Sequence, residues 1–545
     1  MSVWGTVTFK SLMAHYTRVR TSYFLLGLVM LVCGGCVAIQ SRTAPEKTHV
    51  FEQPETTGLG RLLASSGQAH PGQSGFRLLE NGREALVART ALADAAEHTI
   101  DAQYYICDPD AAGSLFFQRL IAAADRGVRV RLLLDDNNLS DDREMATLCA
   151  HPNIEVRVFN PFTFRARWAR LPQYAVDFNR MVRRMHNKIF IADNAVSIIG
   201  GRNIGNTYFS LDSESNFRDF DLLVAGPLTH DASAAFDEYW NSEWSVPATR
   251  LVWRAPKPED LDKLKQQIAA RVRTVEGFEQ ENEERGRGYL HELTARDALV
   301  WADGEIISEP PRKIQPGSHE TTQVSALLEQ EYRRTRKELL VEVAYIVPTE
   351  EFQNELNDLR RRGVSVKIMT SALEATDVSM VFSAYEKYRP NLLAAGVELY
   401  EYKAHASLTR SERRWYKPRS TLSSLHTKAI VFDRERVYIG SANLDPRSVK
   451  LNTEIAVLVH SRKLAKQMTD YLAEDFSPTR SWHVQLHSAW EYRPERGIWR
   501  ERKYLTWNGE HEGQPITLYV ERAASLWQRT KAFLYSLLPG IEPQL

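Results

Sequence analysis

The stretch RRMHNKIFIADNAVSIIGGRN (183–203) decides the fold of this chain, because its pattern returns in SSLHTKAIVFDRERVYIGSAN (423–443). Each copy contains the motif His-x-Lys-x4-Asp, followed by a second apolar run, a glycine turn and an asparagine. The short apolar runs predict a strand, a turn and a second strand in each copy. Two copies with matched continuations predict a duplicated catalytic half-site.

The motif residues suit the chemistry of a phosphodiester. Residues two apart on a strand share a face, so we expect His186 with Lys188, and His426 with Lys428, to point the same way. Because histidine titrates at about 6.5, one imidazole can attack phosphorus while the other protonates the leaving oxygen. The two lysines would hold the non-bridging oxygens. This scheme requires no metal and no other cofactor.

Two asparagines are further candidates for the phosphate site. Asn203 and Asn443 each follow their motif aspartate by ten residues, and their amides can donate to the same oxygens. A single motif match would be a frequent accident, and a lone histidine beside an apolar strand is usually a structural residue. The duplication favours catalysis, and an inactive homologue is the remaining alternative.

The motif and its surroundings resemble the phospholipase D superfamily, and within it they are most similar to the cardiolipin synthase C branch. The resemblance runs from about residue 60 to the C-terminus and includes HTIDAQYYI (98–106), RGVRVRLLLDDNN (126–138), IIGGRNIG (198–205), IGSANLDPRS (439–448) and LNTEI (451–455). It implies an α/β fold: two homologous phospholipase-D-like α/β sandwich halves, each a mixed sheet flanked by helices, packed pseudo-two-fold around one active site. It also implies that one motif histidine becomes a phosphohistidine and that the other is the acid.

The resemblance further implies that an acidic residue downstream of each motif orients that motif's own histidine. The matching positions are Asp219, 33 residues after the first motif histidine, and Glu454, 28 residues after the second. The longer first spacing leaves the nearby Asp221 and Glu214 as alternatives.

The remaining motif positions are assigned supporting roles. Asp193 and Asp433 are interpreted as structural residues that fix the turn after each strand. Ser441 is a candidate phosphate-binding residue, but the first copy has Gly201 at this position. We therefore expect the two halves to bind phosphate differently.

Length and composition bound the class of protein. The 545 residues are enough for two to four domains, and 43% hydrophobic with 25% charged residues is typical of a globular protein. Lys plus Arg and Asp plus Glu both number 69, so no basic excess favours a nucleic-acid partner. Whether Cys107 and Cys149 pair is left open by the sequence.

Residues 1–36 have the pattern of a targeting segment. Two arginines precede an apolar run at 23–32, which is too short to cross a bilayer comfortably. Two glycines before Cys36 resemble a bacterial lipobox, so we expect a lipidated Cys36 and a membrane-associated enzyme at the periplasmic face. Val37 favours the outer membrane by the family sorting rule. An uncleaved anchor, an inner-membrane location and a start at Met13 are the alternatives.

The rest of the chain divides where composition and pattern change. We expect a tether at 37–75, a first phospholipase-D-like domain at 76–250, a charged helical insertion and Pro-rich linker at 251–323, a second such domain at 324–480, and an aromatic and basic extension at 481–545. Both domains contain a strand, a helix closed by a glycine (Gly127 and Gly363), and two further strands. This order is typical of α/β sheets covered by helices.

Three stretches interleave aromatic and basic residues and are candidates for contact with a membrane surface: PFTFRARWARL (161–171), TRSERRWYKPRS (409–420) and ERAASLWQRTKAFLYSLLPG (521–540). The last stretch places one apolar stripe on a helix, made of Ala523, Leu526, Trp527, Thr530, Leu534 and Leu537. Packing of these segments on their own domains is the alternative.

The sequence thus predicts a cardiolipin synthase-type phosphatidyltransferase. The resemblance implies transfer of a phosphatidyl group from a phospholipid to phosphatidylglycerol through a phosphohistidine. Phosphatidylethanolamine and a second phosphatidylglycerol are both open as donors, and any helper protein is unknown. A phospholipase D hydrolase is the nearest alternative, because only the acceptor differs. A phosphodiesterase or nuclease, and a lipoprotein that only binds anionic lipid, are more distant alternatives.

Overall fold

The computed structural model describes residues 46–139, 141–165, 173–174, 177–295, 297–315, 317, 322–406, 420, 422–493, 498–521 and 524–536. The chain forms two units, Met1–Ala44 with Phe162–Val176, and Pro45–Pro161 with Asp177–Leu545. In the described part of the first unit, the rings of Phe162 and Tyr174 meet edge to face with centroids 5.7 Å apart. The second unit contains both copies of the motif.

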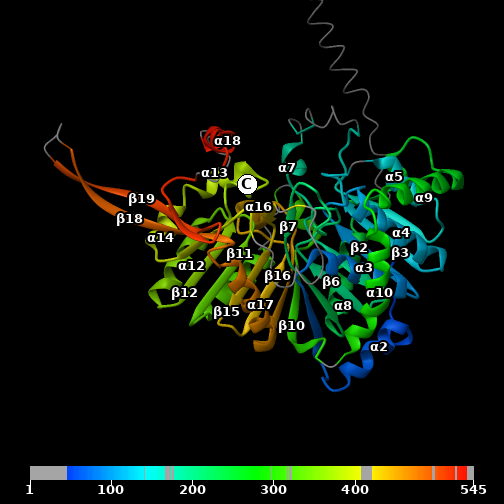
Figure 1. Cartoon of the computed structure of the whole chain (residues 1–545). Helices are drawn as coiled ribbons and strands as arrows, with labels where there is room; N and C mark the ends of the chain where they lie inside the picture. Colours follow the sequence, from blue (N-terminus) through cyan, green and yellow to red (C-terminus); the bar gives the residue numbers. More distant parts are fainter. Residues whose placement is uncertain are drawn as a thin grey trace, which may run out of the picture. The chain divides into compact units, whose positions relative to one another are not determined.

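The first half of this unit is a mixed sheet flanked by helices (Figure 1). Three strands are parallel, and the others pair antiparallel around them. In spatial order the strands are β9 (Ser245–Pro247), β4 (Ile154–Phe159), β3 (Arg129–Asp135), β2 (Thr99–Tyr104), β5 (Ile189–Ala192), β6 (Val196–Gly200), β8 (Asp221–Ala225) and β1 (Ser74–Leu79). The main helices are α3 (Gly82–Ala95), α4 (Ala111–Asp125), α5 (Asp142–Leu148) and α8 (Leu228–Trp240).

The second half repeats this arrangement. Its strands in spatial order are β17 (Ile455–His460), β16 (Arg436–Gly440), β15 (Lys428–Phe432), β11 (Glu338–Val343), β12 (Ser365–Ser371), β13 (Glu398–Tyr402), β18 (Ser481–Arg493), β19 (Ile498–His511) and β20 (Gln514–Leu518). Its helices are α11 (Gln323–Arg334), α12 (Glu350–Arg361), α13 (Ser379–Tyr385), α14 (Arg389–Ala394), α16 (Pro446–Lys450) and α17 (Arg462–Asp475). The predicted strand and helix order is therefore confirmed in both halves.

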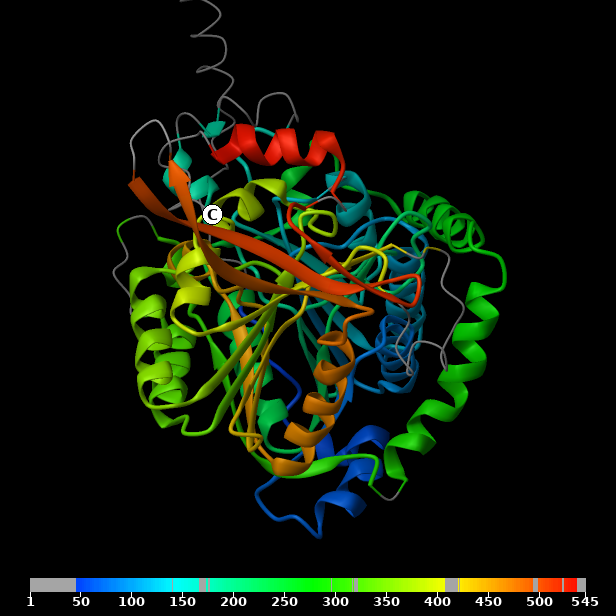
Figure 2. The same ribbon diagram turned by 60° about the vertical axis from the view of Figure 1, so that its left-hand side comes forward.

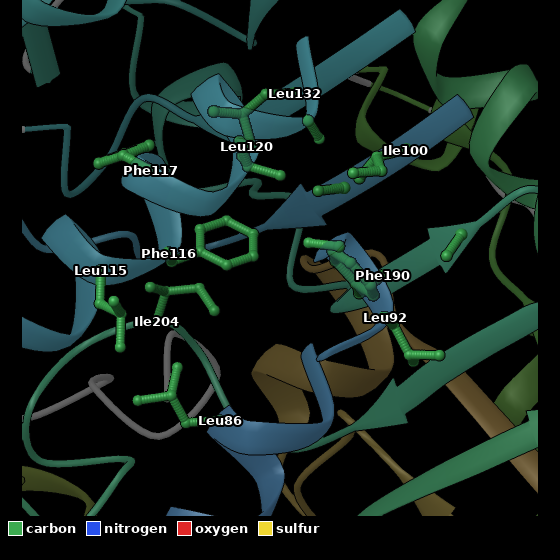
Figure 3. Packing of buried hydrophobic residues seen from close by; sticks show 14 of the residues in the cluster. Leu86, Leu92, Ile100, Leu115, Phe116, Phe117, Leu120, Leu132, Phe190 and Ile204 are labelled. Atoms are coloured by element: carbon green, nitrogen blue, oxygen red, sulfur yellow. The ribbon is translucent and has the colours of Figure 1, made fainter. Parts of the chain in front are cut away.

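The apolar strand residues build separate outer cores and one shared core. On the outer face of the first sheet, Phe116 and Leu120 of α4 pack near Ile100 and Phe190 (Figure 3). The shared core joins apolar residues of β5, β6 and β8 to those of β15, β16 and β17, together with α8 and α17. Burial on both faces explains why these strands read as continuous apolar runs.

The insertion between the halves differs from the sequence-based expectation. The charged segment forms two helices, α9 (Pro258–Val272) and α10 (Phe278–Thr294), separated at Gly277 with φ of 70°. The following residues form a strand that was not predicted, β10 (Val300–Ser308). One end of β10 pairs with β1 and the other with β17, so this strand joins the two sheets.

The expected tether is also partly structured. Residues 54–56 form the short helix η1 (Pro54–Thr56), followed by α2 (Gly58–Gly67). Ahead of them, Thr48 is fixed to the first half, since its N–H donates to Asn241 and its hydroxyl accepts from Trp240. The predicted leader and Cys36 lie outside the described residues. Cys107 and Cys149 are free thiols.

The motif aspartates bind backbone N–H groups beside the strand turns. Asp193 accepts three backbone N–H groups, from Glu97, His98 and Thr99, at 2.8–2.9 Å. Asp433 accepts the three equivalent groups, from residues 336–338, at 2.6–3.1 Å. Both aspartates have left-handed backbones, with φ of 52° and 54°. Each carboxylate thus ties the turn to the start of the neighbouring antiparallel strand, β2 or β11.

Removing these carboxylates should destabilise the fold unequally. Asp193 is fully buried, whereas the hydrogen bonds of Asp433 lie at the surface, where water can replace them. Losing the hydrogen bonds should therefore cost more free energy of unfolding at Asp193 than at Asp433. We expect Asp193→Ala to lower the free energy of unfolding by about 2–4 kcal/mol, and Asp433→Ala by less. Chemical denaturation measures both, with exposed Asp262→Ala as the control. An equal loss in all three variants would contradict this role.

Candidate active site

The two motif histidines are positioned by strand pairs that cross between the halves. The N–H of His186 donates to the carbonyl of Thr453 at 2.9 Å, next to an isolated bridge between Met185 and Thr453. In the other direction, the N–H of His426 donates to Arg218 at 2.8 Å. That bond extends a two-stranded parallel sheet of β7 (Asn216–Arg218) and β14 (Ser423–Leu425).

The crossed backbone pairing also exchanges the carboxylates. Nδ1 of His186 lies 2.9 Å from Oε2 of Glu454, and Nδ1 of His426 lies 2.6 Å from Oδ2 of Asp219. The expectation that each acidic residue orients its own motif's histidine is therefore wrong. In the sequence, each carboxylate residue comes directly after the residue whose carbonyl binds the backbone N–H of the opposite half's histidine. Each carboxylate therefore contacts the histidine of the opposite half and not that of its own motif.

The structure resolves which acidic residue of the first half is equivalent to Glu454. The N–H of Gly201 donates to the carbonyl of Phe220, and the N–H of Ser441 donates to that of Ile455. These matching bonds make Asp219 the equivalent residue despite its longer spacing. Asp221 instead forms a buried ion pair with Arg89 at 2.9 Å, and Glu214 is exposed.

The contacts of these carboxylates explain why one half has Gly201 where the other has Ser441. The hydroxyl of Ser441 donates to Glu454 and accepts the N–H of Ile455 at 3.0 Å, so it supports the carboxylate. At Gly201, a Cβ atom would lie 2.2 Å from Oδ1 of Asp219. Any side chain there would displace Asp219, which explains the asymmetry between the halves.

The motif lysines fold back towards the histidines. Nζ of Lys188 donates to the carbonyl of His186 at 2.6 Å, and Nζ of Lys428 donates to that of His426. Nζ of Lys188 also lies 5.4 Å from the centre of the Tyr105 ring. Burial lowers the pKa of both ammonium groups, against the opposing pull of Glu454 and Asp219.

Burial and the lysine charges keep both histidines neutral. Burial is the largest cause that lowers the pKa of His186 to about 4, and the charges of Lys188 and Lys428 lower it further. The pKa of His426 is also lowered to about 4, by burial and by the same two lysines. Because both lysine charges lower the pKa of each histidine, the two half-sites are electrostatically coupled.

The carboxylates set which histidine nitrogen can react. Burial raises the pKa of Glu454, but His186, Lys188 and Ser441 outweigh it and lower the pKa to about 2. The pKa of Asp219 is lowered for the same reason, with His426 as the largest opposing partner to burial. An ionised carboxylate only accepts hydrogen bonds, so each Nδ1 carries the proton. Each Nε2 then presents the lone pair.

The two asparagines are placed differently from each other. The side-chain oxygen of Asn203 accepts the N–H of Ile106 at 3.1 Å, and its nitrogen donates to the hydroxyl of Tyr208 at 2.9 Å. In the second half, Oδ1 of Asn443 is buried without a hydrogen-bond partner. Asn203 therefore uses its side-chain amide to hold neighbouring residues in place. Of these two asparagines, Asn443 is the one with a side-chain oxygen that forms no hydrogen bond.

Sequence reasoning missed the aromatic residues around the histidines. The ring of Tyr105 meets His186 edge to face at 5.0 Å, and Tyr208 meets His426 in the same way at 5.3 Å. Phe217 lies 5.1 Å from His426. The HTIDAQYYI run contained the signal for Tyr105, since this residue directly follows the buried strand β2. No such signal marked Tyr208 or Phe217.

The comparisons with known proteins identify the family of this chain. The family model "Cardiolipin synthase, PLD-like domain" matches residues 90–240 and 328–476, once in each half. The chain belongs to this family. It is 37% identical over 475 residues to "Cardiolipin synthase C" of Escherichia coli (strain K12), covering 86% of this chain and 96% of that protein.

More distant relatives of this PLD-like family give the same assignment. "Cardiolipin synthase" of Geobacillus kaustophilus is 28% identical over 434 residues, covering 78% of this chain and 70% of that protein. The solved phosphatidylserine synthase of Haemophilus influenzae Rd KW20 superposes with a TM-score of 0.50 at 14% identity, covering 75% of this chain and 90% of that one. This structural likeness shows the two-half PLD-like fold.

In the described part of this PLD-like chain, no group of three or more His, Cys, Asp and Glu side chains is arranged to hold a metal ion. Among the same residues, no helix has the length and apolar character needed to cross a bilayer.

The lowered histidine pKa values predict how stability depends on pH. Between about pH 6.5 and 4, the unfolded chain binds protons that the buried histidines do not bind, so acidification destabilises the fold. We expect His186→Asn to reduce this slope by up to about 1.4 kcal/mol per pH unit. Denaturation at a series of pH values measures the slope separately from any packing loss. An unchanged slope would contradict the burial of a neutral His186.

Proposed function

We propose that the chain is a cardiolipin synthase-type phosphatidyltransferase that forms a phosphatidyl-histidine. The observation that carries this proposal is the pair of buried histidines, each held through Nδ1 by a carboxylate of the opposite half. The family match and the cardiolipin synthase relatives support a phospholipid as the substrate.

The first step cleaves the donor lipid. Nε2 of one histidine attacks the phosphorus, and the bond from phosphorus to the headgroup oxygen breaks. The other histidine gives a proton to the leaving oxygen. In the free site its pKa is about 4, and the negative charge of a bound phosphodiester raises the pKa towards the working pH. Lys188 and Lys428 hold the non-bridging oxygens and balance their charge.

The second step reverses the roles. The histidine that acted as acid now accepts the proton from a hydroxyl of phosphatidylglycerol, whose oxygen attacks phosphorus. The bond between phosphorus and the first histidine breaks, and cardiolipin leaves. The first histidine is thereby regenerated as a neutral imidazole. Phosphatidylethanolamine and a second phosphatidylglycerol are both donors compatible with this sequence of steps.

Hydrolysis is the closest alternative to transfer. Water can resolve the same intermediate and give phosphatidic acid, because only the acceptor changes. The names of the relatives favour transfer. The neutral balance of 69 cationic and 69 anionic residues disfavours a nuclease, which gains its affinity from many cationic contacts.

The sequence and the family support a location at the membrane. We propose a bacterial protein held at the membrane, with a lipid on Cys36 at the periplasmic face. Val37 favours the outer membrane, and an inner-membrane anchor is the alternative. The substrate itself places the enzyme at a lipid surface in either case.

A product assay tests the function. The full-length protein is incubated with labelled phosphatidylethanolamine and phosphatidylglycerol in vesicles, with and without EDTA, and the lipids are separated. We expect cardiolipin in both conditions, and a loss of at least a thousandfold in His186→Ala and His426→Ala. Phosphatidic acid as the main product would favour the hydrolase, and complete loss in EDTA would contradict the metal-independent scheme.

The same variants assign the nucleophile. Rapid quenching with donor lipid labelled at phosphorus should trap an acid-labile phosphoryl group on the protein. The variant that retains the nucleophile traps label slowly, and the variant that lacks it traps none. The absence of trapped label in the unsubstituted protein, under conditions where cardiolipin forms, would contradict a covalent intermediate.

A further inference from the structure

The C-terminal helix α18 (Leu526–Ser536) is attached by one side and exposes an apolar stripe on the other. Ala524 and Ala532 are buried, and the helix packs against α13. Leu526 and Trp527 are 74% and 69% exposed, and Leu534 is 54% exposed. At 100° per residue these three side chains share the face opposite Ala532. The described members of the predicted stripe, which include Thr530, are therefore exposed and do not pack on the protein, whereas Ala523 and Leu537 lie outside the described residues.

The ribbon formed by β18 and β19 exposes a second aromatic surface. Near the body of the protein the ribbon is buried through Trp482 and Trp507. Farther out, Trp490 is 68% exposed and Trp499 is 64% exposed. The register places Tyr492 opposite Trp499, with ring centroids 5.3 Å apart, and alternation puts all three aromatic residues on one face.

These two surfaces lie at the same end of the unit. Figures 1 and 2 are related by a turn about the vertical axis, and in both views the ribbon rises towards the end where α18 lies. Figure 1 places α7 (Phe178–Met181), α13 and α16 at this end as well. The segments that lead into or out of the motifs thus lie at the end that carries the exposed aromatic residues.

A short path connects α18 to the catalytic residues. Asp377 lies just before α13 and accepts the hydroxyl of Tyr345. Burial lowers the pKa of Lys428 and raises that of Tyr208, whose ring meets His426, and the charge of Asp377 acts on both groups by favouring their protonated forms. The helix that supports α18 therefore begins beside the catalytic half-site.

The charges on α18 indicate the partner. On α18 the apolar stripe is flanked on its two sides by Arg529 and Lys531, and the described helix contains no acidic residue. On the ribbon, the register places exposed Glu501 and Lys503 on the aromatic face, with Glu501 opposite Trp490, and exposed Arg500 and Arg502 on the other face. The cations that flank the stripe of α18, together with the aromatic side chains of both surfaces, suit the headgroup region of an anionic bilayer.

We propose that the outer stripe of α18 and the aromatic face of the β18–β19 ribbon form one lipid-docking surface for an anionic phospholipid bilayer. The outer stripe consists of Leu526, Trp527, Thr530 and Leu534, and the aromatic face consists of Trp490, Tyr492 and Trp499. Docking would turn the end of the unit that carries α13 and α16 towards the lipid. This proposal goes beyond the reaction itself, because bilayer insertion is measured without turnover.

Brominated-lipid quenching tests insertion directly. The full-length protein is mixed with vesicles of brominated phosphatidylcholine and phosphatidylglycerol, and tryptophan fluorescence is recorded. We expect strong quenching that falls at least threefold in the variant W490F/W499F/W527F, even if the N-terminal segment still holds the protein on the vesicle. The matched control is Trp253→Phe, since Trp253 is 98% exposed but lies outside both surfaces, and it should keep the quenching.

A turnover assay separates docking from chemistry. The variant W490S/W499S/W527S/L534Q should lose at least tenfold of its turnover on vesicles but keep its turnover on short-chain lipid in detergent micelles. Quenching that persists in W490F/W499F/W527F, or dimerisation of the protein without quenching, would overturn the docking proposal. No turnover of either substrate form by the unsubstituted protein, with quenching intact, would overturn the proposed reaction and leave docking supported.

Discussion

The site depends on two hydrogen bonds between a histidine of one half and a carboxylate of the other. His186 and Glu454 are 268 residues apart, and His426 and Asp219 are 207 residues apart. Each bond is accompanied by a backbone hydrogen bond from the same histidine to the residue just before the carboxylate. Neither half therefore contains a complete histidine–carboxylate pair, and the proposed site exists only when the halves are packed on their shared core.

This exchange also sets the electrostatics of the site. Two lysines and two carboxylates are buried together, so their charges balance before a substrate binds. Burial and the lysines keep the histidines neutral, and the carboxylates hold their Nδ1 protons. The site can consequently accept an anion. The negative charge of that anion would raise the pKa of one imidazole, which could then be protonated and act as the acid.

The sequence predicted the parts of the site that depend on local pattern. The duplicated motif, the strands after it and the turn aspartates all follow from spacing within a few residues. The spacing did not predict that Asp219 and Glu454 each bind the histidine of the opposite half, because this arrangement arises from contacts between residues more than 200 positions apart. Strand β10 was missed for a related reason: its residues are only half-buried and lack strong apolar alternation, and its pairing with both sheets provides the order.

Double-mutant cycles test the exchange most directly. His186→Asn is combined with Glu454→Gln in one cycle and with Asp219→Asn in another, and the free energy of unfolding of each variant is measured at neutral pH. The exchanged arrangement predicts a coupling of about 1–3 kcal/mol between His186 and Glu454, and less than about 0.5 kcal/mol between His186 and Asp219. The reverse pattern, with the larger coupling between His186 and Asp219, would contradict the account.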